Sequence, residues 1–205
     1  MRLLAITDRA QMGADPVAKV ARLGAMLGPQ LAVLVREPSL SPRALFEFGA
    51  ALRDLLAPLG AALLISDRGD VARALGVGLQ LKESSYGVPE ARALLGSAAL
   101  IGASRHDAAG VARAAAEGAS YVTVSPIFAA PGKGAPLGLP GWTEIRQANP
   151  TARLIALGGI DVAHAAALFG AGADAIAAIR AAWAEDLALP RWIQAHNALA
   201  RPEKV

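Results

Sequence analysis

The sequence predicts a single α/β domain, a compact (β/α)8 barrel that takes up residues 1–205. Three observations indicate this fold. Short apolar runs recur eight times, segments with helical spacing of apolar residues lie between them, and polar residues and glycines gather where the runs end. Strands and helices in alternation build a parallel sheet, and eight such units close it into a barrel with its helices outside.

The eight apolar runs are expected to be strands buried on both faces, because they lack the apolar–polar alternation of a half-exposed strand. They cover residues 3–7, 31–35, 62–66, 77–81, 99–103, 121–125, 154–157 and 173–179. The alternative architecture is an open doubly wound sheet, which usually has a glycine-rich turn after its first strand. The first run here ends in Thr7-Asp8-Arg9 without a glycine cluster, so the barrel is favoured.

Helices are expected in the segments between these runs. Apolar residues recur at helical spacing in residues 16–27 and 42–56, which predicts helices with one face on the sheet. Asp107 is expected to cap a helix over residues 107–117, and Gly118 to end it. Further helices are expected at 70–75, 89–95 and 163–169, and the last and longest at 181–199.

The composition narrows the functional class. Apolar residues make up 54% of the chain and charged residues 18%, which is typical of a globular protein. No apolar run approaches the roughly 18–20 residues that span a bilayer, and the apolar N-terminal run is too short for a signal peptide, so we expect a cytoplasmic protein without a membrane partner. The absence of cysteine excludes disulfides and thiolate metal sites. The net charge of +3 is spread along the chain and aromatic residues are 4%, so no nucleic-acid partner is expected.

Polar residues follow most of the expected strands, where a (β/α)8 barrel carries its functional site. They are Asp8 and Arg9, Arg36 and Glu37, Asp67 and Arg68, Gln80 and Lys82, Ser104 and His106, Ser125, and Arg180. Gly158 and Gly159 end the seventh run, where backbone N–H groups can face an anion. The loops after strands 7 and 8 of such barrels often bind phosphate. The sequence therefore predicts a site for a small molecule that carries a phosphate.

Motifs at these strand ends resemble the thiamine-phosphate synthase/TenI superfamily over nearly the whole chain. They are Ala5-Ile6-Thr7-Asp8, Val35-Arg36-Glu37, Ile65-Ser66-Asp67-Arg68, Ile101-Gly102-Ala103-Ser104-Arg105-His106, Tyr121-Val122-Thr123-Val124-Ser125-Pro126-Ile127-Phe128, Lys133, and residues 156–160 and 172–179. Each motif is short, but together they keep the family's order. The resemblance implies a (β/α)8 fold and a thiazole phosphate bound by the backbone at Gly158 and Gly159 and after strand 8.

The resemblance covers two branches with different chemistry. The synthase joins a pyrimidine pyrophosphate to a thiazole phosphate and holds Mg²⁺ with carboxylates. Asp67 matches one metal ligand, but Ser85 stands where the family has the second aspartate, and Lys82 stands at a glycine position. The threonine-rich pyrophosphate loop is reduced to residues 129–133, of which only Lys133 is kept. These departures favour the TenI branch, whose thiazole tautomerases move a proton without a metal. We therefore expect no cofactor for this chain. Mg²⁺ would be expected only if the chain were a synthase.

For a tautomerase, the expected catalytic residues are His106, as the proton shuttle, and Glu37, as its acid or base partner or as the group that orients the substrate. The expected substrate-binding residues are Arg36, Gln80, Ser104, Lys133, Gly158, Gly159, Ile179 and Arg180. Residues 128–139, rich in glycine, proline and alanine, are expected to form a mobile lid over this site.

Alternatives remain open at this point. Each of these residues also has a purely structural interpretation. Glu37 could form an ion pair with Arg36 or Arg68, and Asp67 could form one with Arg68 or Lys82. His106 could simply begin a helix, and Gly158 and Gly159 could serve only close packing between strand and loop. The chain is alternatively a thiamine-phosphate synthase, or a non-catalytic barrel that binds a phosphate ligand. The resemblance also allows a homodimer.

Overall fold

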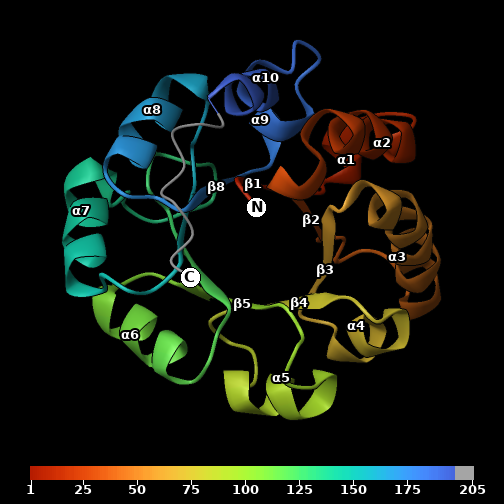
Figure 1. Cartoon of the computed structure of the whole chain (residues 1–205), viewed down its shortest axis with the longest axis horizontal. Coiled ribbons are helices and arrows are strands. Elements are labelled where there is room, and N and C mark those ends of the chain that lie inside the picture. Colours follow the sequence, from red (N-terminus) through yellow and green to blue (C-terminus); the bar gives the residue numbers. More distant parts are fainter. Residues whose placement is uncertain (197–205) are drawn as a thin grey trace.

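Eight parallel strands close into a barrel in the order β1 to β8, and β8 pairs with β1 (Figure 1). The structure is a computed structural model that describes residues 1–196. The strands are β1 Leu3–Ile6, β2 Leu31–Val35, β3 Ala62–Ser66, β4 Gly78–Leu81, β5 Ile101–Arg105, β6 Tyr121–Val124, β7 Leu154–Leu157 and β8 Ala175–Ala178. The (β/α)8 barrel predicted from the sequence is therefore confirmed.

Helices surround the barrel and cover the outer face of the sheet (Figure 1). They are α1 Arg9–Met12, α2 Pro16–Leu27, α3 Pro42–Leu56, α4 Gly69–Leu75, α5 Val88–Leu95, α6 Ala108–Ala116, α7 Gly138–Ala148, α8 Val162–Gly170, α9 Arg180–Trp183 and α10 Ala188–Ala195. Short 3-10 turns follow α2 and α3, at Gly28–Gln30 and Ala57–Leu59. Side chains that accept a backbone N–H of the first turn fix five of the helix starts within residues 1–196, namely those at Asp8, Asp15, Ser41, Asp107 and Asp161.

The buried residues form two layers. The smaller cluster draws only on strands and includes Leu4, Leu34 and Tyr121, which places it inside the barrel. The larger cluster joins the opposite faces of the strands to the helices. Successive side chains of a strand point to opposite faces, so each strand is buried on both. This double burial explains why the sequence showed runs without alternation.

Besides α1 and α7, for which no residue range was predicted, two elements differ clearly from the sequence predictions. β5 lies two residues later than the expected 99–103, because the strand pairs with β6 through Arg105. The expected long helix over 181–199 is wrong for its described part, which forms α9 and α10 with Leu187 in a left-handed conformation between them. Pro190 lies in the first turn of α10, where a missing N–H costs no helical hydrogen bond, so it suits a new helix better than a continuing one. Residues 197–199 lie outside the described part of the chain.

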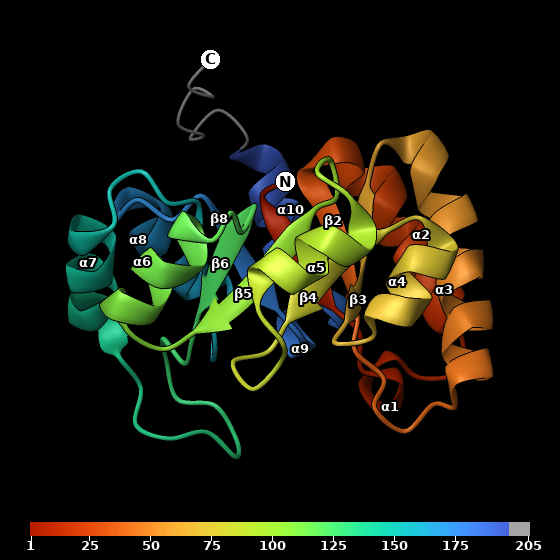
Figure 2. The same cartoon turned by 90° about the horizontal axis from the view of Figure 1, so that it is seen from below.

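The carboxyl ends of the strands meet at one end of the barrel. Figure 2 shows the connection from β6 to α7 projecting at this end, together with α1 and α9. Within residues 1–196, no helix is long and apolar enough to cross a membrane.

Candidate active site

A cavity of about 690 Å³ opens at the carboxyl ends of β1, β2 and β6 to β8. Three exposed cations line it, Arg36 in the loop after β2, Lys133 in the loop after β6 and Arg180 at the start of α9. Asp161, its one acidic lining residue within the described chain, accepts hydrogen bonds from the first turn of α8. The lining is therefore net positive and suits an anionic ligand. It also includes Ser125 and Ile179.

The Gly158–Gly159 turn forms one wall of this cavity. Both residues have positive φ, 109° and 62°, which favours glycine. A Cβ on Gly158 would lie 2.8 Å from the Cα of Pro126, and one on Gly159 would lie 2.5 Å from the carbonyl oxygen of Ala129. Phe128 also donates its backbone N–H to the Gly158 carbonyl at 2.9 Å. The glycines thus let the loop after β6 approach β7, as the packing alternative expected, and their phosphate-binding role remains a prediction.

Gln80 and Ser104 meet inside the barrel and lie outside the lining of the cavity. The Gln80 amide donates to the Ser104 hydroxyl at 3.0 Å and to Thr123 at 3.3 Å, and its oxygen accepts from Tyr121 at 2.6 Å. Burial raises the pKa of Tyr121, which keeps this hydroxyl neutral and able to donate. Gly102 makes room for the network, since a Cβ there would lie 2.2 Å from the Gln80 oxygen.

The sequence reasoning missed Tyr121 and Thr123 as members of this network. A signal was present in the threonine at the third position of an otherwise apolar strand, and in the glycine at position 102 of the neighbouring one. Both strands are buried on both faces, so a hydroxyl inside them requires a polar partner. The network joins the polar side chains that β4, β5 and β6 point into the barrel.

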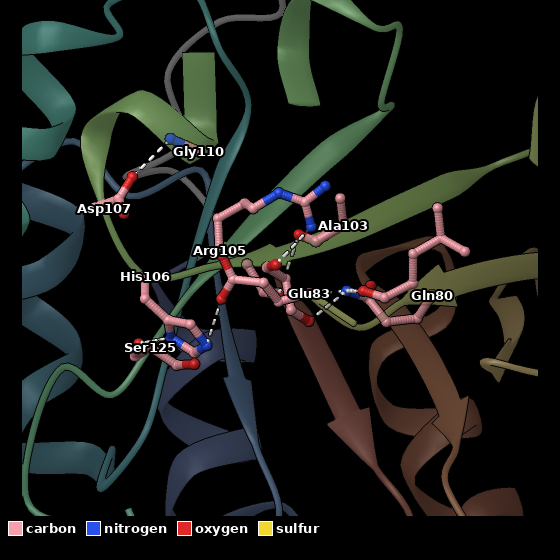
Figure 3. Close-up of polar contacts among 11 residues, drawn as sticks. Gln80, Glu83, Ala103, Arg105, His106, Asp107, Gly110 and Ser125 are labelled. Atoms are coloured by element: carbon pink, nitrogen blue, oxygen red, sulfur yellow. Dashed lines mark hydrogen bonds and ion pairs between the residues drawn. The ribbon is translucent and has the colours of Figure 1, made fainter. Parts of the chain in front are cut away.

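His106 lies between two loops, as Figure 3 shows. Its Nδ1 is 2.5 Å from the Ser125 carbonyl oxygen, and its Nε2 is 3.1 Å from Oε2 of Glu83. Both contacts are therefore made to oxygen atoms, one of the backbone and one of a carboxylate. Asp107 caps α6 through the Gly110 N–H, as the sequence predicted (Figure 3). His106 thus ties the loop after β4 to the loop after β6.

Glu37 contacts the backbone of a neighbouring loop, and within residues 1–196 it makes no hydrogen bond or ion pair with His106. Its Oε1 accepts the backbone N–H of Arg9 at 3.1 Å, so it joins the loop after β2 to α1. It also does not form the alternative ion pair with Arg36 or Arg68 within the described residues, and Arg68 instead pairs with Asp70. Glu37 and His106 therefore contact different groups in the structure.

Asp67 forms an ion pair with Lys82, one of the two structural alternatives for this residue. The Lys82 ammonium lies 2.6 Å from Oδ2 of Asp67, and the Ser85 hydroxyl donates to Oδ1. Burial of Asp67 opposes its ionisation, but the hydrogen bonds from Lys82 and Ser85 and the charge of Lys82 outweigh burial and lower its pKa. Asp67 is therefore an anion at neutral pH.

These residues do not fit a magnesium site. Mg²⁺ prefers several oxygen ligands in octahedral geometry, usually with carboxylates among them. Both oxygens of Asp67 already accept hydrogen bonds, Ser85 is neutral, and Glu83 contacts His106. Across residues 1–196, no group of three or more His, Cys, Asp or Glu side chains is arranged to hold a metal.

The expected lid is anchored to α8 at its start. Phe128, at its start, stacks on His164 of α8 with ring centroids 3.9 Å apart. The lid also ends earlier than expected, since α7 begins at Gly138. Between these points the segment carries Lys133 to the cavity. Its motion remains a prediction.

Comparisons with known proteins agree with one another. The family model described as thiamine monophosphate synthase matches residues 3–182. A thiamine-phosphate synthase of Albidiferax ferrireducens is 40% identical over 185 residues, which are 88% of this chain and 84% of that protein. One from Moorella thermoacetica is 36% identical over 173 residues, 82% and 81% of the two chains. The solved thiamine phosphate pyrophosphorylase of Pyrococcus furiosus superposes with a TM-score of 0.80 at 27% identity, covering 97% of this chain and 94% of that one.

Proposed function

The chain belongs to the thiamine monophosphate synthase family, and we propose that it is a transferase that joins a pyrimidine pyrophosphate to a thiazole phosphate. The products are thiamine phosphate and pyrophosphate. The observation that carries this proposal is the identity of 40% with a thiamine-phosphate synthase over 84% of that protein's length. The positively charged cavity at the carboxyl ends of the strands supports it, because both substrates are anions.

The tautomerase expected from the sequence is wrong. The similar proteins are named thiamine-phosphate synthases, over most of their length and from several organisms. The expectation rests on replaced residues in the metal half of the site, which by themselves indicate a loss of the transfer reaction. The structure shows that Lys82 and Ser85 both bind Asp67, so these replacements build a connected unit.

The transfer reaction places a specific demand on the protein. The C–O bond between the pyrimidine methylene and the pyrophosphate breaks, and its electron pair leaves with the pyrophosphate oxygen. The lone pair of the thiazole ring nitrogen forms the new C–N bond to the methylene carbon. No proton moves at the reacting atoms, so the main task is to stabilise negative charge on the leaving group and to align the two substrates.

The cavity residues suit that task. We place the thiazole phosphate at the turn formed by Gly158 and Gly159 and at the segment of Ile179 and Arg180, where both loops line the cavity. Arg36 and Lys133 reach the same cavity from the loops after β2 and β6. Their charges attract the phosphates of both substrates, and the planar guanidinium of Arg36 can bind two phosphate oxygens at once.

The test is product formation by the purified protein. The protein is incubated with the pyrimidine pyrophosphate and the thiazole phosphate, once with Mg²⁺ and once with EDTA, and thiamine phosphate is measured by liquid chromatography and mass spectrometry. We expect thiamine phosphate from the unmodified chain and much less from Arg36→Ala, with unchanged activity in Arg43→Ala, which removes an exposed arginine from α3. Binding of the thiazole phosphate without any product would contradict the transferase and indicate a non-catalytic barrel.

A further inference from the structure

The residues Asp67, Lys82 and Ser85, which we call the Asp67 unit, connect the ends of two neighbouring strands. Asp67 follows β3 and Lys82 follows β4, and the Asp67 N–H donates to the Gln80 carbonyl at 2.9 Å. The Ser85 hydroxyl donates to Asp67 and accepts the backbone N–H of Lys82 at 2.9 Å. Each member thus contacts the other two, and the ammonium is held at a defined place at the carboxyl end of the barrel.

The ammonium of this unit remains accessible. The Lys82 side chain is 53% exposed, and Asp67 is its one hydrogen-bond acceptor within residues 1–196. An ammonium group has three N–H donors, so two are left for a ligand. Lysine is a common phosphate ligand because it presents a compact positive charge.

The charge of the unit equals that of the metal site which the family resemblance implies. Two aspartates and one Mg²⁺ sum to zero, and so do one aspartate, one lysine and a serine. The net charge is zero only when Lys82 and Ser85 occur together, since an aspartate at position 85 beside Asp67 and Lys82 would give the group a net charge of −1. The two departures from the family pattern therefore compensate each other electrostatically.

The unit also lies at the end of the barrel that binds substrate. It follows β3 and β4, and the cavity extends over the ends of β1, β2 and β6 to β8, so the two occupy different sectors of one ring. Arg36, a lining residue of the cavity, follows β2, which pairs with β3, so the two sectors are neighbours in strand order. A thiazole phosphate at β7 and β8 leaves the sector of β3 and β4 for the second substrate.

We propose that Lys82, held by Asp67 and Ser85, takes the place of the divalent metal and binds the leaving pyrophosphate directly, so that this chain binds pyrophosphate without Mg²⁺. The inference rests on the proposed transferase for its role in turnover. Lys82 keeps its proton while the C–O bond breaks and the C–N bond forms, and its charge stabilises the pyrophosphate that departs with the electron pair.

The first experiment measures binding of inorganic pyrophosphate by isothermal titration calorimetry in buffer with EDTA. We expect binding by the unmodified chain and a loss of roughly tenfold or more in Lys82→Gln, the size expected for a hydrogen bond between charged groups. Lys82→Arg keeps the charge and should retain most of the affinity. Arg73→Gln, which removes an exposed cation from α4, is the charge control and should bind as the unmodified chain does.

The second experiment rebuilds the two-aspartate set in the double variant Lys82→Gly/Ser85→Asp. Titrated with Mg²⁺ alone, this variant should bind the metal, and the unmodified chain should not. Thermal melting checks that every variant folds. Pyrophosphate binding that requires Mg²⁺ in the unmodified chain, or that is unchanged in a folded Lys82→Gln, would overturn the inference. Binding that depends on Lys82 in a protein that forms no thiamine phosphate would support this site and refute the transferase.

Discussion

Replacing Gly158 with alanine puts a Cβ 2.8 Å from the Cα of Pro126 and 3.1 Å from the backbone nitrogen of Ile127, closer than well-packed atoms allow. It also places a side chain on a residue with a φ of 109°. The backbone strain costs about 1–2 kcal/mol, and the overpacking against the loop after β6 adds about 1–3 kcal/mol. We therefore expect Gly158→Ala to lower the free energy of unfolding by about 2–5 kcal/mol.

Gly76 provides the matched control for this prediction. It has a φ of 67° at the end of α4, and a Cβ there would meet no atom within 4 Å. Gly76→Ala therefore tests backbone strain alone, with an expected cost of about 1–2 kcal/mol. Both variants are measured by urea unfolding followed by circular dichroism.

Binding of the thiazole phosphate provides a second measurement on the same variants. Gly158→Ala moves a wall of the cavity and should weaken binding, and Gly76→Ala should leave it unchanged. Equal losses of stability in the two variants would refute the reasoning, because they would show that the close approach to Pro126 contributes nothing.

Three other predictions concern buried contacts and pH. Gln80→Leu removes the acceptor of the Tyr121 hydroxyl inside the barrel and should cost about 2–3 kcal/mol in urea unfolding; a cost near zero would contradict the network. Trp183→Phe removes the 2.8 Å hydrogen bond to the Ile6 carbonyl and should lower the free energy of unfolding by about 1–3 kcal/mol. An unchanged urea midpoint would contradict this prediction. The pKa of Asp67 is lowered in the folded state, so its stabilising effect is present above the unfolded value of about 3.9 and is lost as the pH falls through the folded value. The stability difference between the unmodified chain and Asp67→Asn should therefore be larger at pH 7 than at pH 3, and equal differences at the two pH values would refute the pairing.

The barrel could be predicted because strand burial determines the pattern of apolar residues in the sequence. Strands covered on both faces are short apolar runs, and their number and spacing determine the fold class. The positions of Arg36, Gly158 and Arg180 at one cavity followed from the same reasoning, since each comes after a strand, whereas Lys133 was expected there from the family resemblance. The last helix was harder, because apolar spacing continues across the break at Leu187 and only Pro190 signals a second start.

The contacts between loops could not be predicted in the same way. His106 meets Glu83 and Ser125, which are far from it in the sequence, and apolar periodicity carries no information on such pairs. Asp67 and Lys82 were considered as partners, but the part of Ser85 in joining them depends on how the loop after β4 folds back. Without that geometry, a serine in place of an aspartate appeared only as a missing ligand, and the function was assigned to the wrong branch.

The most direct test of the proposed function is the stoichiometry of the reaction. The purified chain is supplied with isotopically labelled pyrimidine pyrophosphate and unlabelled thiazole phosphate, and the products are quantified over time by mass spectrometry. Our account predicts one labelled thiamine phosphate and one pyrophosphate for each pyrimidine pyrophosphate consumed. Consumption of neither substrate, or release of pyrophosphate without any thiamine phosphate, would contradict it.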